Sequence, residues 1–249
     1  MIEYRFRQKA AVGIAAAVMA VAMIVAGGQA GAGGGQGAAT QANANPGVIP
    51  NRGNQYGDLA VKWWQWAYSF PALEVPFFNT GGPVDVSAGQ SGHVWFLAGA
   101  NNGPATRTAN VPAGTKLFFP MANAINDYPC PPQFGFEPAP GESLEHFLQR
   151  TGNDYLGTIT DLFAEIDGKP LANLGSYRNT SDIFTFTADP AIAAIFDPCV
   201  TGTPQPGVAI GYWLLLAPLP PGVHTLHFGA PSWGQDVTYV LTVKPGRGQ

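Results

Sequence analysis

Two carboxylates occupy neighbouring positions on one face of a predicted strand. Glu165 and Asp167 are separated by a single residue, and residues two apart in a strand share a face with about 7 Å between their Cα atoms. Glycoside hydrolysis uses two carboxyl groups about 5 to 10 Å apart. The pair therefore predicts a carbohydrate-active hydrolase or lyase with Glu165 and Asp167 as catalytic residues. The alternative is that Asp167 serves a turn, because Asp167-Gly168 is a strong signal for a tight hairpin.

Other catalytic and metal-binding patterns are missing from the sequence. Ser91 precedes His93 by two residues but lacks the G-x-S-x-G spacing of a nucleophile elbow. His224 and His227 are three apart in a strand-like run, so their side chains point to opposite faces and cannot chelate a metal together. There is neither an Asp-rich calcium loop nor a glycine-rich phosphate loop after a strand. The sequence predicts no metal site and no cofactor.

Three tryptophans crowd one predicted helix. Over residues 56–68 the apolar spacing is helical, yet Trp63, Trp64 and Trp66 are more than one buried stripe can hold. One interpretation is an aromatic platform that binds a sugar ring, with Trp64 and Trp66 as ligand-binding residues. The other interpretation is that the helix plugs the open end of a sandwich. We favour the second, because aromatic side chains dominate cores more often than they line sites.

Polar residues further along the chain could orient a ligand. Arg107 and Arg178 are positively charged, Asp182 is negatively charged, and Tyr177 lies next to Arg178 in the sequence. We take Tyr177 and Arg178 as additional ligand-binding candidates. The alternative is that the charged side chains form surface ion pairs, each worth under about 1 kcal/mol.

The two cysteines predict a disulfide. Cys130 and Cys199 are the only cysteines in the chain, and each stands beside proline. In an exported protein such a pair is expected to oxidise, tying two loops together with a contribution of roughly 4 kcal/mol in the chain-entropy view. The sharper alternative, a catalytic thiol, has no supporting signature around either residue.

The beginning of the chain predicts export. Three basic side chains precede an uncharged run over residues 10–27, and small residues follow it, so we interpret 1–30 as a signal peptide. An uncleaved membrane anchor is the alternative. Residues 31–54 are predicted to form a flexible Gly/Ala/Gln/Asn linker, 55–244 a single domain and 245–249 a tail. The expected localisation is secreted, periplasmic or in the cell envelope.

The charge of the mature chain argues against two classes of partner. Residues 1–30 hold three of the 12 basic and one of the 16 acidic residues, so their removal leaves nine and 15 and a net charge of −6. Without basic clusters, neither nucleic acid nor, after signal cleavage, a membrane surface is an expected partner. About 195 residues remain after the linker, enough for one sandwich with a substantial core.

The folded part is organised around residues 211–228. Over 212–217 both faces of a strand are apolar, which is typical of a strand covered on both sides. Pro221-Gly222 favours a type II turn, and the chain then returns over 223–228. We therefore predict an antiparallel hairpin buried between a sheet partner and a second layer, with Trp213 and Leu214 inaccessible to solvent.

The remaining segments predict a mainly β domain. Short strands are expected at 93–98, 116–121, 161–166, 182–187 and 236–243, and short helices at 142–150, ended by Gly152, and 190–196. In the helix over 56–68, Asp58 and Lys62 have the i, i+4 spacing of an ion pair. Many short strands with Gly/Pro turns predict an antiparallel β-sandwich, jelly-roll-like or immunoglobulin-like, with an N-terminal helix and short marginal helices.

Several phrases together resemble a set of uncharacterised secreted bacterial β-rich proteins. The resemblance covers most of residues 55–243 and rests on Lys-Trp-Trp-Gln-Trp at 62–66, Val-Trp-Phe-Leu-Ala-Gly at 94–99, Val-Pro-Ala-Gly-x-x-Leu-Phe-Phe-Pro at 111–120, Ile-Asp-Gly at 166–168 and Leu-Pro-Pro-Gly-x-His-Thr at 219–225. It implies a secreted β-rich domain and carries no activity with it.

Three functions remain open from the sequence. The first is a secreted, non-catalytic β-sandwich that binds a polysaccharide or another cell-surface component. The second is the hydrolase or lyase that uses Glu165 and Asp167. The third is a self-assembling structural protein of the cell envelope. The oligomeric state and the ligand are not determined by the sequence.

Overall fold

The computed structural model describes Asn45 and residues 47–78, 84–85, 87–101 and 103–245. The predicted signal peptide, 1–30, and the first part of the predicted linker lie outside these residues, as does the end of the predicted tail.

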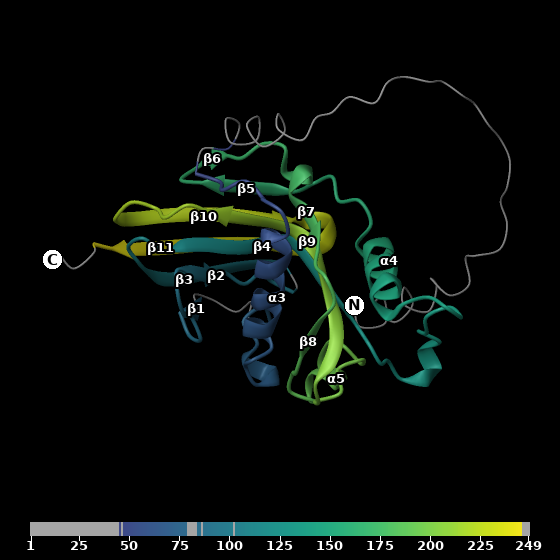
Figure 1. Cartoon of the computed structure of the whole chain (residues 1–249). Helices are drawn as coiled ribbons and strands as arrows, with labels where there is room; N and C mark the ends of the chain where they lie inside the picture. Colours follow the sequence, from purple (N-terminus) through teal and green to yellow (C-terminus); the bar gives the residue numbers. More distant parts are fainter. Residues whose placement is uncertain (1–44, 46, 79–83, 86, 102, 246–249) are drawn as a thin grey trace, which may run out of the picture.

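Two β-sheets pack face to face in the described part of the chain (Figure 1). The six-stranded sheet has the order β1-β3-β11-β10-β5-β6, with bounds β1 Val84–Asp85, β3 Gly103–Pro112, β11 Gln235–Lys244, β10 Gly222–Ala230, β5 Phe163–Ile166 and β6 Lys169–Pro170. The five-stranded sheet has the order β2-β4-β9-β7, and β8 also pairs with β9; its strands are β2 Val94–Phe96, β4 Lys116–Asp127, β9 Gln205–Leu216, β7 Arg178–Thr180 and β8 Phe184–Phe186.

The prediction of a mainly β fold with an N-terminal helix is confirmed, but the sheets are not purely antiparallel. Strand β3 runs parallel to both β1 and β11, and β2 runs parallel to β4. The remaining pairs are antiparallel, including β10 with β11 and β4 with β9. Parallel neighbours require connections that cross over, and residue spacing within single strands carries no signal for them. The jelly-roll and immunoglobulin expectations therefore describe the layers but not the pairing.

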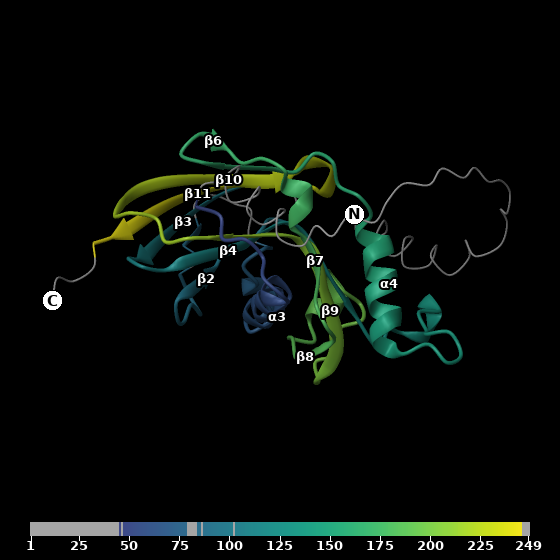
Figure 2. The same cartoon turned by 45° about the horizontal axis from the view of Figure 1, so that its top comes forward.

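Strands β4 and β9 form the middle layer of the molecule. Phe119 on β4 faces the six-stranded sheet, where its ring lies 4.4 Å from that of Phe228. Phe118, the next residue, points the other way and stacks on Trp213 at 5.2 Å under helix α3, Gln55–Ala67. Figure 2 shows α3 on one side of this layer and β10 with β11 on the other. Both Trp213 and Leu214 are fully buried, as predicted.

The prediction that residues 211–228 form an antiparallel hairpin is wrong, because its two strands do not pair with each other. Strand β9 pairs with β4, β7 and β8, whereas β10 pairs with β11 and β5. The proline-rich link over 217–221 thus carries the chain from one sheet to the other. Two long apolar strands in sequence fit an arch between layers as well as a hairpin, because both bury the same faces.

Strand β4 bends at a bulge, and a glutamine satisfies the backbone there. The pairing of β4 with β9 shifts between Pro120 and Ala122. Such a bulge leaves carbonyl groups outside the ladder. The side-chain amide of Gln235, which is buried, donates to the carbonyl oxygens of Pro120 at 2.6 Å and Met121 at 2.8 Å. Gln235 therefore locks the start of β11 onto the bend of β4.

The helices lie at the margins, as expected. The described helices are α3, α4 Leu144–Leu156 and α5 Ile192–Ile195, with short 3-10 turns η1 Ala72–Glu74, η2 Pro132–Phe134, η3 Leu174–Tyr177 and η4 Pro231–Trp233. Helix α4 continues past Gly152, which was expected to end it, because this glycine lets α4 pack closely on Ile210 of β9. None of the described helices combines the length and apolar character that a membrane crossing requires.

The folded domain begins before residue 55. Asn45 is fully buried, its side chain donating to the carbonyl oxygen of Ala172 at 2.7 Å and to the hydroxyl of Tyr177 at 3.0 Å. Val48 is also buried and bridges to Leu216 at the end of β9. The predicted linker, 31–54, is therefore too long at its C-terminal end. Its polar composition concealed one asparagine that has specific partners in the fold.

The predicted disulfide is confirmed. Cys130 and Cys199 are bonded and buried, and they are 69 positions apart in the sequence. A closed loop of this size corresponds to about 4 kcal/mol of stabilisation through the unfolded state. The bond fastens the loop after β4 to the segment that leads into β9.

A methyl group at Gly99 should break the lock formed by Gln235. A Cβ atom there would lie 2.8 Å from Cδ of Gln235, forcing the amide off the bulge carbonyls. We expect Gly99→Ala to lower the free energy of unfolding by about 2 to 4 kcal/mol. Gly175→Ala is the matched control, because a Cβ there meets nothing within 4 Å and the change should stay within about 0.5 kcal/mol. Urea unfolding measures both; equal effects would contradict the role of Gln235.

Candidate functional site

A small pocket lies where α3, the bend of β4 and the start of β11 meet. Its volume is about 30 Å³, which is room for a water molecule or a small chemical group. Aromatic rings, amides and small residues form its walls, and none of these residues is charged: Trp63, Trp64, Phe77, Gly99, Ala100, Asn101, Asn123, Phe196, Trp233 and Gln235.

Trp63 is the centre of the aromatic wall. Its ring contacts those of Trp64 at 5.1 Å, Trp213 at 5.5 Å and Phe77 at 6.0 Å. Its indole N–H donates to the carbonyl oxygen of Leu97 at 2.9 Å, so the polar atom of this fully buried side chain is satisfied. Both tryptophans line the pocket, but consecutive residues are about 100° apart around a helix, so only Trp63 also packs on Trp213 of β9.

Two residues that line the pocket and one beside it hold nitrogen donors without partners among the described residues. The indole Nε1 atoms of Trp64 and Trp213 and the amide Nδ2 of Asn123 are buried without a hydrogen-bond partner among the described residues. Asn123 lies opposite Gly211 in the sheet, and a Cβ at Gly211 would meet both Nε1 of Trp213 and Cβ of Asn123 within 3 Å. Nε1 of Trp213 and the Cβ atom of Asn123 thus both lie beside Gly211. A buried donor without an acceptor costs about 1 to 3 kcal/mol.

The mouth of the pocket carries a half-exposed tryptophan. Trp233, in the turn η4 before β11, is half-buried, and its ring meets that of Tyr155 edge-on at 5.6 Å. Asp161 holds this turn by accepting hydrogen bonds from the backbone N–H and the hydroxyl of Ser232, both at 2.6 Å. Burial opposes ionisation of Asp161, but the hydrogen bonds from Ser232 outweigh it and lower the pKa of this carboxyl.

Of the four sequence-predicted binding residues, only Trp64 lines the pocket. Trp66 is buried and donates to the carbonyl oxygen of Ala88 at 3.3 Å. Tyr177 is buried and accepts from Asn45. The surplus of tryptophans is mainly core, as the favoured interpretation holds, but one of the three presents an unpaired donor.

Arg178 has a structural role in the fold. Its guanidinium donates to the carbonyl oxygens of Gly157 and Asn153 at the C-terminal end of α4, with 3.1 Å to Asn153. It also lies over the ring of Tyr212 at 5.6 Å. A cation at this end of a helix satisfies free carbonyls and complements the helix dipole. Arg107 is fully buried and donates to the carbonyl oxygen of Pro76 at 2.7 Å, so the surface-pair alternative does not apply to it.

Glu165 on β5 and Asp167 in the turn that follows it are not among the residues that line the pocket, and their surroundings differ. Asp167 occupies a turn with a positive φ of 51°; its carboxylate accepts from the backbone N–H of Thr225 at 2.9 Å and is 2.8 Å from Nδ1 of His224. Glu165 stands opposite His227 in the ladder. Neither residue lines the aromatic pocket beside Trp64. The turn accounts for Asp167, and the geometry lends the two-carboxylate mechanism no support.

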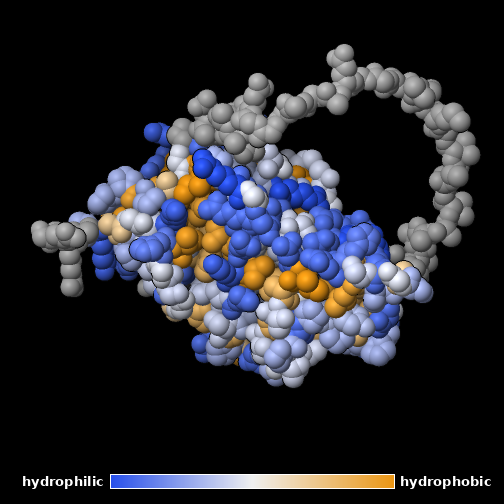
Figure 3. All heavy atoms as spheres, viewed as in Figure 1, coloured by the Kyte–Doolittle hydropathy of each residue, from blue (hydrophilic) through white to orange (hydrophobic). Residues whose placement is uncertain are grey.

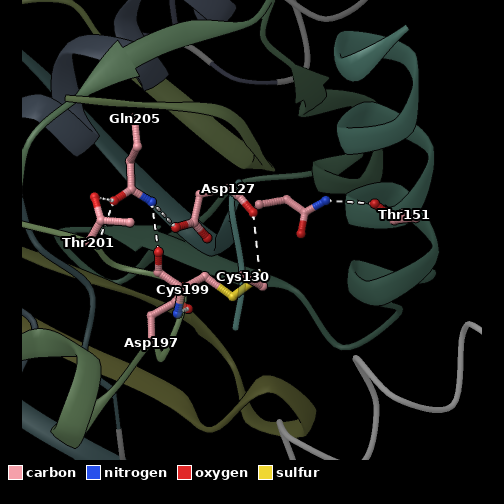
Figure 4. Close-up of a disulfide and its surroundings, with 8 residues drawn as sticks. Asp127, Cys130, Thr151, Asp197, Cys199, Thr201 and Gln205 are labelled. Carbon is pink, nitrogen blue, oxygen red and sulfur yellow. Dashed lines mark hydrogen bonds between the residues drawn. A yellow bond between two sulfur atoms is a disulfide. The ribbon is translucent and has the colours of Figure 1, made fainter. Parts of the chain in front are cut away.

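One cluster has metal-ligating residue types, but its sulfur is not a free ligand. Asp127, Asp197 and Cys199 bring their ligand atoms within 4.8 Å of one another. The Cys199 sulfur is bonded to Cys130, and a metal requires the thiolate. Figure 4 shows what the cluster does: the Gln205 amide donates to Asp127 at 2.6 Å and to the Cys199 carbonyl oxygen at 2.9 Å. The cluster therefore holds the backbone around the disulfide in place.

The comparisons with known proteins are negative. No protein-family model matches the chain, and neither curated proteins nor solved structures give a significant match. The resemblance to secreted bacterial β-rich proteins therefore stays a prediction.

Sequence reasoning missed Asn123, Gln235 and Trp233. Asn123 did carry a signal, because it interrupts the apolar run 117–125. Trp233 stands in a Pro-Ser-Trp-Gly turn, outside any strand alternation, which also marks an aromatic side chain without a predicted core position. Gln235 carried none, since its partners are carbonyls exposed by a bulge more than a hundred residues earlier.

Replacing Trp63 and Trp64 one at a time should show how much a hydrogen-bonded indole N–H adds to stability compared with an unpaired one. Trp63→Phe leaves the Leu97 carbonyl oxygen without its donor, whereas Trp64→Phe removes a donor that has no acceptor. We expect Trp63→Phe to cost about 1 to 2 kcal/mol more of unfolding free energy than Trp64→Phe. Thermal and urea unfolding of both variants measure the difference. A larger loss for Trp64→Phe would show that its N–H is satisfied.

The pKa of His224 should depend on Asp167. Both ring nitrogens face acceptors, the Asp167 carboxylate and the Pro220 carbonyl oxygen at 2.9 Å, so the imidazolium is favoured and the pKa is raised above its ordinary value. The same contact lowers the pKa of Asp167. The histidine's contribution to stability is present below its unfolded pKa of about 6.5 and is lost as pH rises through the folded value. The contribution of Asp167 to stability is present above its unfolded pKa of about 4 and is lost as the pH falls through its lower folded pKa.

Histidine NMR titration measures this coupling. Asp167→Asn should lower the pKa of His224, because the carboxylate is the main cause of the rise. Asp236→Asn is the control, since it removes the carboxylate 2.8 Å from the other strand histidine, His227. An unchanged His224 pKa in Asp167→Asn would contradict the assignment.

Proposed function

We propose that this protein is an exported, non-catalytic glycan-binding module whose binding site is the pocket beside Trp64. The observation that carries the proposal is that Trp64 and Asn123, two of the uncharged residues that line the pocket, each have a buried N–H donor without a hydrogen-bond partner among the described residues. A ligand with acceptor oxygens would supply the missing hydrogen bonds. The partner is a polysaccharide or another cell-surface component that exposes such a group.

A sugar fits this combination better than a charged or wholly apolar ligand. Its hydroxyl or carbonyl oxygens accept from Trp64 and Asn123, and its C–H faces pack on indole rings. The amide N–H groups of Gln235 donate to the carbonyl oxygens of the β4 bulge, so its Oε1 can accept a hydrogen bond from a sugar hydroxyl. No lining residue offers a charge to a cationic or anionic centre.

The volume limits what enters the pocket. Small-molecule sites usually enclose about 300 to 1,000 Å³, and this one has about 30 Å³. One substituent of a sugar, such as a hydroxymethyl or acetamido group, occupies such a space while the ring rests on Trp233 at the mouth. This geometry favours binding at chain ends or branches of a glycan.

Export is supported by two independent features. The first residues have the pattern of a signal peptide, and the buried Cys130–Cys199 disulfide fits an oxidising compartment. We place the mature protein outside the cytoplasm, in the periplasm, in the cell envelope or secreted.

A glycan array followed by tryptophan-fluorescence titration tests the function on the mature chain. We expect binding to a neutral or N-acetylated glycan, and about a tenfold or greater loss in Asn123→Ala, since an interfacial hydrogen bond is worth about 1 to 2 kcal/mol. Asn110→Ala, an exposed asparagine on β3, is the matched control and should bind like the natural chain. Absence of binding across the array, or equal affinity of Asn123→Ala, would overturn the proposal.

A further inference from the structure

A second concave site lies on the opposite side of α3 from the aromatic pocket. It is an open groove of about 350 Å³, within the range of ligand sites. Its α3 side is a stripe of residues spaced three and four apart, including Asp58, Leu59 and Lys62. The other wall comes from the beginnings of β2 and β4, with Val94 and Lys116.

The groove concentrates positive charge in an acidic chain. Among the described residues, Arg52, Lys62 and Lys116 line it with one carboxylate, that of Asp58, although the whole chain has a net charge of −4. A second carboxylate, that of Asp182, borders the groove by accepting from the Asn54 amide at 3.0 Å. None of the three cations forms an ion pair among the described residues. The predicted pair of Asp58 with Lys62 is not formed there either; the Asp58 carboxylate has the Asn54 amide at 3.5 Å.

The cations stand round an apolar floor that is fixed in place. Leu59, Val94 and the buried Leu215 form the floor. Ile49 donates its backbone N–H to the Leu215 carbonyl oxygen at 2.8 Å, which holds the segment carrying Arg52 along the end of β9. The described lining of the groove therefore comes from four separate stretches of the chain: residues 52–62, β2, β4 and β9.

We infer that this groove binds the acidic groups of an anionic polysaccharide. Carboxylate or sulfate groups on the polymer pair with the three cations, and the C–H face of the sugar covers the apolar floor. A membrane surface is disfavoured because the apolar residues are recessed between the cations, and a lipid headgroup layer requires them to protrude. Lys116 and Asn123 are seven residues apart on β4, about 20 Å along the strand. The groove is thus a site distinct from the aromatic pocket.

Dextran, carboxymethyl-dextran and dextran sulfate are suitable probes, because they share one backbone and differ in charge. Binding of the mature chain, followed by biolayer interferometry, should occur with the two charged polymers and not with dextran. It should disappear at about 1 M salt, where the screening length falls to about 3 Å. Preference between carboxymethyl-dextran and dextran sulfate identifies which anion the groove takes. Binding to anionic lipid vesicles without binding to either charged polymer would overturn the inference.

Charge variants locate the site. Lys62→Gln with Lys116→Gln should weaken binding of the charged polymers about tenfold. Lys169→Gln with Lys244→Gln removes the same charge elsewhere on the surface and should change it less than about twofold. Asp58→Asn should instead tighten binding, because it removes the one carboxylate among the described residues that line the groove. Equal losses in the two double variants would show nonspecific attraction and overturn the inference.

Unfolding curves for each variant confirm that it is folded. Asn123→Ala should bind the charged polymers like the natural chain, since it changes only the aromatic pocket. Failure of the groove and failure of the glycan pocket therefore give different patterns across the same set of variants.

Discussion

The structure depends on two strands, β4 and β9, that are apolar on both faces and must be covered on both. The six-stranded sheet covers one face through contacts such as Phe119 with Phe228, and α4 continues that cover where the sheet ends. Helix α3 covers the other face with Trp63. A fully buried large side chain contributes about 1.5 to 3 kcal/mol, so leaving either face open would remove much of the core. The N-terminal helix and the crossing between sheets follow from this requirement.

Covering a bent strand leaves polar groups that need partners. At the β4 bulge the Gln235 side chain supplies them, and near the disulfide the Gln205 side chain does the same for Asp127 and Cys199. In the pocket this compensation is missing, since the donors of Trp64 and Asn123 have no hydrogen-bond partner among the described residues. Buried unpaired groups are uncommon in folded proteins and call for an explanation. A ligand oxygen or an ordered water provides one, and the uncharged aromatic walls make a sugar the better candidate.

Helix α3 connects the two proposed sites. One side of it carries the tryptophans that close the core and border the pocket; another carries Asp58 and Lys62 along the cationic groove. Patches of hydrophobic residues lie among hydrophilic ones across the face shown in Figure 3, so the surface is mixed there. Two separate sites of different chemistry are what a module that holds a long, heterogeneous polysaccharide would use: one reads an uncharged substituent and the other attracts the acidic backbone.

The sequence by itself determined the local properties: the helix near 55–67, the alternation of β11, the Asp167-Gly168 turn, the disulfide and the double burial of Trp213. These depend on residue type and spacing over a few positions. It could not determine which strands pair, because arch and hairpin bury the same residues, nor that parallel neighbours occur. It nominated Trp64 among several candidates, but only the tertiary structure shows whether an indole N–H finds an acceptor. That outcome depends on backbone carbonyls and amides from distant segments, whose meeting is a property of the whole fold.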